Sequence, residues 1–305
     1  MRFRAHDTFF IRKGWLTKGL KNVNAKADVF TNKKENPMDV LGIGANMVKA
    51  LRYWMIATNL TEEVKGKQRV QKLTSFGELV YEYDSYFEEL GTLWSIHYQL
   101  CKNDSAATSW HYFFNLFNLN EFTKEDFTYS LNKYLLHEQG ESKPERTLDD
   151  DFTCIINTYM SRMKSSLSKI HPENNIDCPL TELGLVDYMN RSKKTYRKVT
   201  PSIDSLDPLI ILSVILDQSK GKNTDEILIS SILNDKSNAG RIFCLDNITL
   251  ISLLYKLELL GFVELVRTAG LDVVKIKTEW DYITCIKEYY KSLNEQNGET
   301  NGKHD

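Results

Sequence analysis

Long hydrophobic runs are absent from this sequence. No stretch of about 18 consecutive apolar residues occurs, so no membrane-spanning helix is expected. The first residues, MRFRAHDTFFIRKGW, lack the apolar core and the small-residue cleavage site of a secretory signal. Cysteine is scarce, and the five cysteines form no C-x-x-C pair, which argues against a disulfide framework or a zinc site. These absences predict a protein of the reducing cytoplasm.

Charge is present in both signs but is divided unevenly along the chain. Over all 305 residues the formal charge is −2, and a composition of 42% hydrophobic and 26% charged residues is that of a globular protein with two or three domains. Residues 1–72 contain 15 Lys and Arg against 6 Asp and Glu, a charge of +9, whereas the remainder contains 24 against 35, a charge of −11. Such a split predicts that the first quarter faces an anion, of which nucleic acid is the usual one. The alternative is a solvated basic face with no polyanion partner.

A nucleotide-binding loop is also missing, although LGIGANM contains a Gly-x-Gly pair. A dinucleotide fingerprint needs a preceding strand and a third glycine, and this sequence has Met47 at the third position. A phosphate-binding loop of the Walker type would need Gly-Lys followed by Ser or Thr, which does not occur there. The pair is therefore interpreted as a tight turn.

A helix-turn-helix is predicted around that turn, with a short helix at residues 36–41, the turn at 42–44 and a second helix at 45–58. Apolar spacings of three and four predict that the second helix buries Met47, Val48, Leu51, Trp54 and Met55. A β-hairpin wing is predicted next, because Val64 and Val70 flank a Lys-Gly-Lys tip. Basic and amide side chains on the opposite faces are suited to phosphates and base edges. The residues predicted to contact DNA are Arg4, Arg12, Lys13, Lys18, Asn46, Lys49, Arg52, Tyr53, Lys65, Lys67, Arg69 and Lys72.

The remaining sequence predicts a mainly α protein with small β wings. An N-terminal winged helix-turn-helix domain is expected at residues 1–90, a helical, aromatic-rich middle at 91–200, a C-terminal winged-helix-like domain at 201–293 and a flexible tail at 294–305. The polar segment 190–208 is expected to be a linker. In the C-terminal domain, a helix at about 246–260 with Asp246 as its cap precedes two strands at 262–267 and 271–277. Because this helix carries little positive charge, it is expected to mediate protein contacts or dimerisation.

Several sequence blocks resemble a known bacterial family. RFRAHDTFFIRKGWLTKGL, LGIGANMVKALRYW, TLWSIHYQL, CPLTELGLV and RTAGLD occur in the order found in the family labelled domain of unknown function four-thousand-and-seven, and together they span nearly the whole chain. The chain departs from the family at Ala45, where a lysine is common in the turn, and this removes one possible phosphate contact.

The resemblance implies membership of the SspB type, a component of single-strand DNA phosphorothioation systems in anti-phage defence. It implies DNA nicking in the company of an ATPase, a sulfurtransferase related to PAPS reductases and a cysteine desulfurase. A homodimer is a further expectation. The resemblance supplies no nuclease motif that can be matched to residues of this chain.

Two places in the sequence could supply nicking chemistry. In the N-terminal block, His6 could act as acid or base and Asp7 could bind a divalent metal such as Mg²⁺ or Mn²⁺. The alternative is a packed N-terminal segment. The acidic block holds Glu145 and Asp149–Asp151, and its simpler interpretation is a helix start with Thr147 as cap and Asp150 at the third position. His6 and Asp7 are predicted as the catalytic pair because they lie in the basic region.

Two functions therefore remain. The first is a DNA-binding component of a phosphorothioation system that nicks one strand so that sulfur can be incorporated. The second is a non-enzymatic winged-helix regulator or assembly adaptor. Winged helices also mediate protein contacts, so the expected fold alone does not decide between them.

Overall fold

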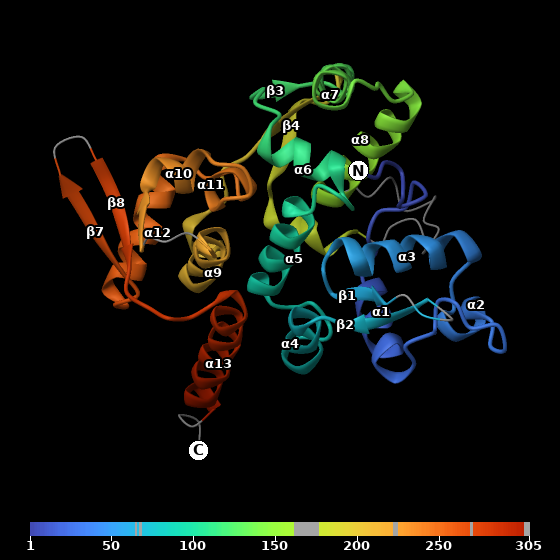
Figure 1. The fold of residues 1–305 in the computed structure, drawn as a ribbon, viewed down its shortest axis with the longest axis horizontal. Helices are drawn as coiled ribbons and strands as arrows, with labels where there is room; N and C mark the ends of the chain where they lie inside the picture. The colour runs from blue at the N-terminus through green and yellow to red at the C-terminus, as the bar shows by residue number, and fades with distance from the viewer. Residues whose placement is uncertain (65, 67–68, 162–176, 222–224, 269–270, 302–305) are drawn as a thin grey trace. The chain divides into compact units, whose positions relative to one another are not determined.

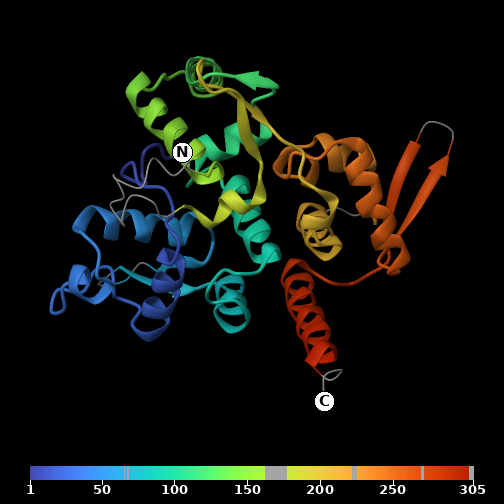
Figure 2. The ribbon, with the colours of Figure 1, turned by 180° about the vertical axis from the view of Figure 1, so that it is seen from behind.

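The computed structural model describes residues 1–305 apart from 65, 67–68, 162–176, 222–224, 269–270 and 302–305. The chain divides into two compact units, Met1–Val199 (unit 1) and Thr200–Asp305 (unit 2). Within the described residues it is mostly helical with three small antiparallel sheets, as Figures 1 and 2 show from opposite sides. This confirms the predicted mainly α class with small β elements. The finer division of unit 1 near residue 90 stays a prediction.

The N-terminal part of unit 1 contains three helices and a hairpin. They are α1 (Trp15–Ala25), α2 (Pro37–Leu41), α3 (Ala45–Ala57), β1 (Thr61–Val64) and β2 (Val70–Leu73). The Asn36 side chain accepts a hydrogen bond from the Met38 N–H and so caps α2, and Gly42 ends that helix with a φ of 60°. The two predicted helices flanking the turn are therefore present with ends within about two residues of the prediction, and two paired strands follow them.

Close packing fixes α1 and the hairpin against α3. Leu51, Trp54 and Met55 on α3 are fully buried. A Cβ on Gly19 of α1 would lie 2.4 Å from the Met55 sulfur, so only glycine allows this approach of the two helices. At the hairpin, Gln71 donates a hydrogen bond to the Arg52 carbonyl of α3 (3.0 Å). The wing is thus attached to α3 through a buried polar contact.

The rest of unit 1 is built around aromatic side chains. Its elements are α4 (Ser75–Tyr83), α5 (Leu90–Lys102), α6 (Thr108–Asn115), β3 (Glu121–Phe122), α7 (Lys124–Gln139), α8 (Glu145–Tyr159), a 3-10 helix η3 (Pro179–Leu183), β4 (Val186–Asn190) and β5 (Thr195–Lys198). The two histidines of this region are buried and hydrogen-bonded: His97 contacts the Tyr159 hydroxyl (2.7 Å) and His111 the Cys101 carbonyl (2.9 Å). They are core residues.

The predicted linker at 190–208 was wrong over β5, which is the central strand of the sheet β3-β5-β4. Tyr196 on β5 is buried and stacks on Phe122 of β3. The Lys198 ammonium donates hydrogen bonds to the carbonyls of Phe113 (2.5 Å) and Phe117 (2.6 Å), at the C-terminal end of α6. The half-buried Lys198 thus ties this polar segment to α6, a contact that the sequence pattern does not reveal.

Unit 2 contains a further helix–strand arrangement. Its elements are η4 (Ile203–Ser205), α9 (Pro208–Ser219), β6 (Glu226–Leu228), α10 (Ile229–Asn234), α11 (Ala239–Ile242), α12 (Asn247–Leu259), β7 (Val263–Thr268), β8 (Leu271–Ile276) and α13 (Tyr282–Asn301). Asp246 caps α12 by accepting from the Thr249 N–H (2.7 Å), as expected. The sequence did not predict β6, which pairs with β8 in the order β6-β8-β7.

The helix α13 continues through Asn301, into the segment 294–305 predicted as a flexible tail, and residues 302–305 lie outside the described residues. This helix packs against α9. No helix among the described residues combines the length and apolar character needed to cross a bilayer.

Replacement of Gly77 tests the closest backbone approach in unit 1. A Cβ at Gly77 of α4 would lie 1.9 Å from the Leu60 carbonyl oxygen, so Gly77→Ala must displace backbone. We expect a loss of about 1–3 kcal/mol in the free energy of unfolding, measured by urea denaturation. Gly44→Ala is the control: a Cβ there meets nothing within 4 Å, so its effect should stay below about 1 kcal/mol. Equal losses in the two variants would contradict the packing of α4.

Candidate nucleic-acid interface

A cavity of about 610 Å³ opens beside the turn between α2 and α3. Its lining includes Arg12, Lys13 and Lys18 from the start of α1 and the residues before it, together with the turn Gly42–Gly44. Its apolar lining residues are Trp15, Met38, Ile43 and Met47. The fold thus brings three of the predicted DNA-contacting cations to the Gly-x-Gly turn.

The three cations have no carboxylate partner among the described residues. Across the described part of the chain, no carboxylate forms an ion pair with Arg12, Lys13 or Lys18. The Lys18 ammonium lies 3.8 Å from the position that a Cβ on Gly42 would occupy, so the side chain reaches the turn itself. Three uncompensated positive charges in one concavity make it attractive to an anion.

The position of Arg12 is fixed by aromatic rings. Its guanidinium lies 5.7 Å from the ring centre of Phe9 and 5.3 Å from that of Trp15. These are cation–π distances, and such contacts hold the charge without cancelling it. The first turns of α1 and α3 add positive partial charge at the cavity, because Gly14 and Gly44 cap these helices without a side-chain acceptor.

On α3, the predicted DNA-facing residues divide into two groups. Asn46 and Lys49 are exposed, and the Lys49 ammonium lies 3.5 Å from the Asn46 side-chain oxygen. Arg52 is instead half-buried and donates to Glu63 of β1 (2.5 Å). The α3 face available to a ligand is therefore narrower than predicted.

The prediction that Tyr53 faces DNA was wrong. Tyr53 is 7% exposed, and its hydroxyl donates to the Ala106 carbonyl (3.0 Å). Burial, with a smaller effect of the nearby Asp151 charge, raises the pKa of Tyr53 well above its ordinary value. The phenol therefore stays protonated and serves as an internal hydrogen-bond donor.

The wing retains two exposed cations among its described residues. Arg69 is 71% exposed and lies 3.8 Å from Glu63, and Lys72 is exposed opposite Glu62 in the hairpin register. The predicted contacts Lys65 and Lys67 lie outside the described residues.

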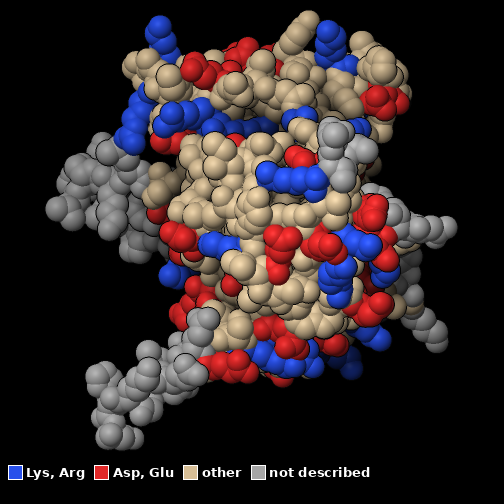
Figure 3. All heavy atoms as spheres, turned by 90° about the vertical axis from the view of Figure 1, so that its left-hand side faces the viewer, with Lys and Arg blue, Asp and Glu red and all other residues tan. Residues whose placement is uncertain are grey.

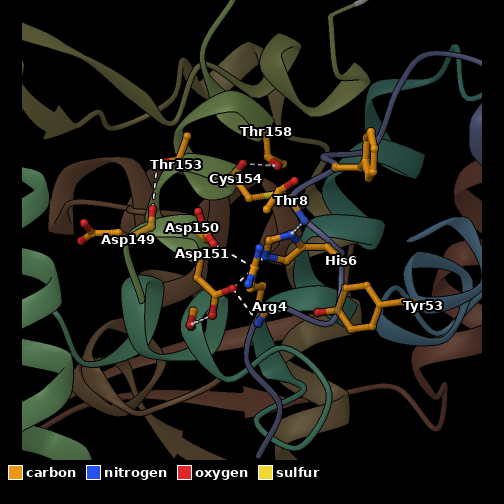
Figure 4. A network of polar contacts seen from close by, with 12 residues as sticks. Arg4, His6, Thr8, Tyr53, Asp149, Asp150, Asp151, Thr153, Cys154 and Thr158 are labelled. Carbon is orange, nitrogen blue, oxygen red and sulfur yellow. Dashed lines mark hydrogen bonds and ion pairs between the residues drawn. The ribbon is translucent and has the colours of Figure 1, made fainter. Parts of the chain in front are cut away.

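The N-terminal and acidic candidate sites prove to be one network (Figure 4). Asp151 of α8 is 1% exposed and accepts three hydrogen bonds: from His6 Nε2 (2.7 Å), from the Arg4 backbone N–H (2.8 Å) and from the Ser109 hydroxyl (2.5 Å). Arg4 also pairs with Asp150 through its side chain (2.9 Å). Arg4 is therefore engaged within the protein and is not a free DNA contact.

The hydrogen bonds of His6 indicate which of its two ring nitrogens carries the proton. Its Nδ1 accepts from the Thr8 N–H (3.1 Å), so the proton that contacts Asp151 is on Nε2. The ring is 1% exposed and stacks on Trp54 at a centroid distance of 5.8 Å. With both nitrogens occupied and no solvent access, His6 is placed to hold the N-terminal segment rather than to transfer protons to a DNA strand, which corrects its predicted catalytic role.

Asp7, the second predicted catalytic residue, lacks the hydrogen-bond network that holds His6. It is half-buried, and no described residue pairs with its carboxylate. Its φ of 49° lies in the left-handed region, as do those of Arg4 and Thr8. Left-handed conformations are uncommon outside glycine, so this segment is held by its contacts with α8.

The acidic block begins a helix as predicted, but the cap residue differs. α8 begins at Glu145 with Pro144 as its cap, so Thr147 is not the cap residue. Asp149 pairs with Lys124 (3.0 Å) and accepts from the Thr128 hydroxyl (2.9 Å). In Figure 4, Asp151 points toward His6 while Asp149 points away from it. Among the described residues, no group of three or more His, Cys, Asp or Glu side chains is arranged to hold a metal ion.

A second cavity in unit 1, of about 570 Å³, lies by the C-terminal end of α8 and is lined by both signs of charge: Asp187 on one hand, Arg191 and Lys194 on the other. Unit 2 is also mixed, with 11 Lys and Arg against 16 Asp and Glu in residues 200–305. Figure 3 presents the side of the molecule that carries β7 and β8 in Figure 1, where charges of both signs surround an uncharged area. Neither the second cavity nor unit 2 has the excess of positive charge found in the cavity beside α1.

Comparisons with known proteins agree with each other. The family model described as "Protein of unknown function (DUF4007)" matches residues 3–290. Two solved structures are similar over 96% of this chain and 87% of theirs, each with a TM-score of 0.80: "SspB crystal structure" at 26% identity and "Magnesium ion-bound SspB crystal structure" at 25% identity. No curated protein sequence matches the chain.

Asp151→Ala tests the buried network. Alanine offers no acceptor to His6, to the Arg4 backbone N–H or to Ser109, so three buried donors lose their partner. We expect the free energy of unfolding to fall by about 3–5 kcal/mol, as when one partner of a buried pair is removed. Asp149→Ala, whose carboxylate is 28% exposed in its ion pair, should cost only about 1 kcal/mol or less. Urea denaturation followed by circular dichroism measures both, and similar losses would contradict the central role of Asp151.

Proposed function

Because this chain belongs to the DUF4007 family, we propose that it is a DNA-binding component of a DNA phosphorothioate-modification system in anti-phage defence. The likeness to SspB structures over almost the whole chain supports the assignment. The observation that carries DNA binding is the cavity with Arg12, Lys13 and Lys18, since phosphate neutralisation dominates affinity for nucleic acid. In such a system the chain would work in the cytoplasm beside an ATPase, a PAPS-reductase-like sulfurtransferase and a cysteine desulfurase.

The proposal includes two winged-helix modules. In unit 1 the order α1, α2, α3, β1, β2 supports a helix-turn-helix with a wing. In unit 2 the order α9, β6, α10, α12, β7, β8, with the sheet order β6-β8-β7, supports the second. The first is assigned to DNA because three of its cations, Arg12, Lys13 and Lys18, line one cavity and have no carboxylate partner among the described residues.

The second module is assigned to protein contacts. On α12, Ile248 is 78% exposed and Leu259 is 88% exposed. Apolar side chains at such exposure favour a protein surface over a phosphate backbone. A homodimer or one of the proposed partners would use this helix.

Asn46 and Lys49 are proposed to contact DNA from α3, with phosphates supplying affinity and base edges supplying any sequence preference. The affinity of the full chain for a duplex should fall steeply as salt rises, and Lys49→Ala should reduce the slope of log affinity against log salt by about 0.9. Fluorescence anisotropy measures both. A flat salt response would exclude DNA binding.

Leu51 is fully buried on the same helix, so Leu51→Ala should instead lower the free energy of unfolding by about 2–5 kcal/mol.

Nicking of one DNA strand is proposed from the resemblance, with Mg²⁺ or Mn²⁺ as the divalent ion. One of the two similar structures is magnesium-bound. The described residues of this chain do not themselves fit such an ion, because no set of three suitable ligands is brought together. No step through the ion is therefore assigned to them. The competing function is a non-enzymatic regulator or assembly adaptor.

A supercoiled-plasmid assay separates these functions. We expect the purified full chain to convert supercoiled plasmid to the open circular form with Mg²⁺ and to lose this activity in EDTA. A lower rate for Asp7→Asn, with the unfolding curve and DNA affinity unchanged, would support the predicted catalytic role of its carboxylate, which has no described partner to lose. Asp39→Asn, an exposed carboxylate on α2, is the control. A chain that binds DNA but leaves the plasmid intact would be the regulator or adaptor.

A further inference from the structure

The cavity beside the α2–α3 turn is lined by two kinds of side chain. Its cations are Arg12, Lys13 and Lys18, and its apolar side chains include those of Met38, Ile43 and Met47. Met38 is 39% exposed and Met47 is half-buried, so both present apolar surface that the fold has not covered. A phosphate alone would use only the cations.

We propose that this cavity holds one unpaired nucleotide of a DNA strand, with its phosphate on the three cations and its sugar and base against the apolar side chains. The inference rests on the proposed DNA binding and adds the form of the ligand. The volume of about 610 Å³ lies in the range of small-molecule sites.

The nucleotide is inferred to be unpaired because the apolar side chains of the cavity need a base or sugar surface to contact. In a duplex the base faces are stacked inside, so a protein surface meets phosphates, sugars and base edges. In a single strand the base faces are free, and proteins bind them with aromatic and apolar side chains beside a positive groove. Arg12 lies over the Phe9 and Trp15 rings, and this places a flat cationic group at the edge of the same cavity.

The backbone around the turn permits close approach. Gly44 has open space where a Cβ would stand, and at Gly42 only the Lys18 ammonium lies within 4 Å of that position. The turn is therefore bare backbone next to the cations. A larger residue at Gly42 would also be strained, because its φ is 60°.

The test uses fluorescence anisotropy with the full chain and two probes: a labelled oligothymidine about twelve nucleotides long, and a duplex of the same length. Lys13→Ala/Lys18→Ala removes two cavity cations. Lys33→Ala/Lys34→Ala removes two exposed cations of the same basic region that do not line the cavity. Among the apolar residues, Met47→Ala is paired with Val40→Ala, an exposed residue of α2 outside the cavity lining.

For the single strand, we expect Lys13→Ala/Lys18→Ala to lower affinity at least about tenfold and to reduce the salt slope by about 0.7 for each phosphate that is no longer neutralised. Lys33→Ala/Lys34→Ala should have a much smaller effect. Met47→Ala should weaken single-strand binding several-fold with an unchanged salt slope, and it should leave duplex binding as it is. Val40→Ala should alter neither.

The possible failures are distinct. Equal losses of affinity in the two lysine double variants would overturn the cavity as a site and leave diffuse DNA binding intact. A Met47→Ala variant that behaves like Val40→Ala, or that weakens duplex and single strand alike, would overturn the unpaired nucleotide. No binding of either probe at low salt would overturn the proposed function together with this inference. Circular dichroism of each variant confirms that affinity is compared between folded proteins.

Discussion

The Asp151 carboxylate is the constraint on which the arrangement of unit 1 depends. A buried carboxylate is costly unless it is fully hydrogen-bonded, and here its acceptors are used by His6, by the backbone of Arg4 and by Ser109. These donors come from the N-terminal segment and from α6, so one side chain of α8 connects three separate parts of the chain. The indole rings of Trp54 and Trp110 then cover His6 from α3 and α6.

This network connects the acidic and basic parts of unit 1. The N-terminal segment is held first at His6, by Asp151, and then at Phe9, whose carbonyl accepts a hydrogen bond from the Trp54 indole N–H (2.9 Å). It continues to Arg12 and the start of α1. The cations of the cavity therefore stand at the end of a segment fixed at two earlier points. Arg4 and Arg52 have carboxylate partners, whereas Arg12, Lys13 and Lys18 do not have one among the described residues. That difference separates cations that stabilise the fold from cations available to a ligand.

Features encoded over short distances were predictable from the sequence, and features that join distant segments were not. The α2–turn–α3 unit, the hairpin and the Asp246 cap follow local spacing and capping preferences. The pairing of His6 with Asp151 joins residues 145 positions apart, and no local pattern shows it. Tyr53 was misplaced because the period of a single helix cannot show that residues near Ala106 cover its second face. Likewise, the composition of β5 is typical of a linker, and only contacts with distant residues, such as Tyr196 with Phe122 and Lys198 with α6, explain its place in a sheet.

The long separation between His6 and Asp151 has a consequence for synthesis of the chain. The segment around His6 precedes α1 in the chain, whereas its acceptor Asp151 on α8 is translated only after α1 through α7. Until then, the left-handed conformations at Arg4, Asp7 and Thr8 lack the contact that offsets their strain. Contacts between distant residues also form slowly, because a long loop must close first. The segment around His6 can therefore reach its final position only after Asp151 has been translated.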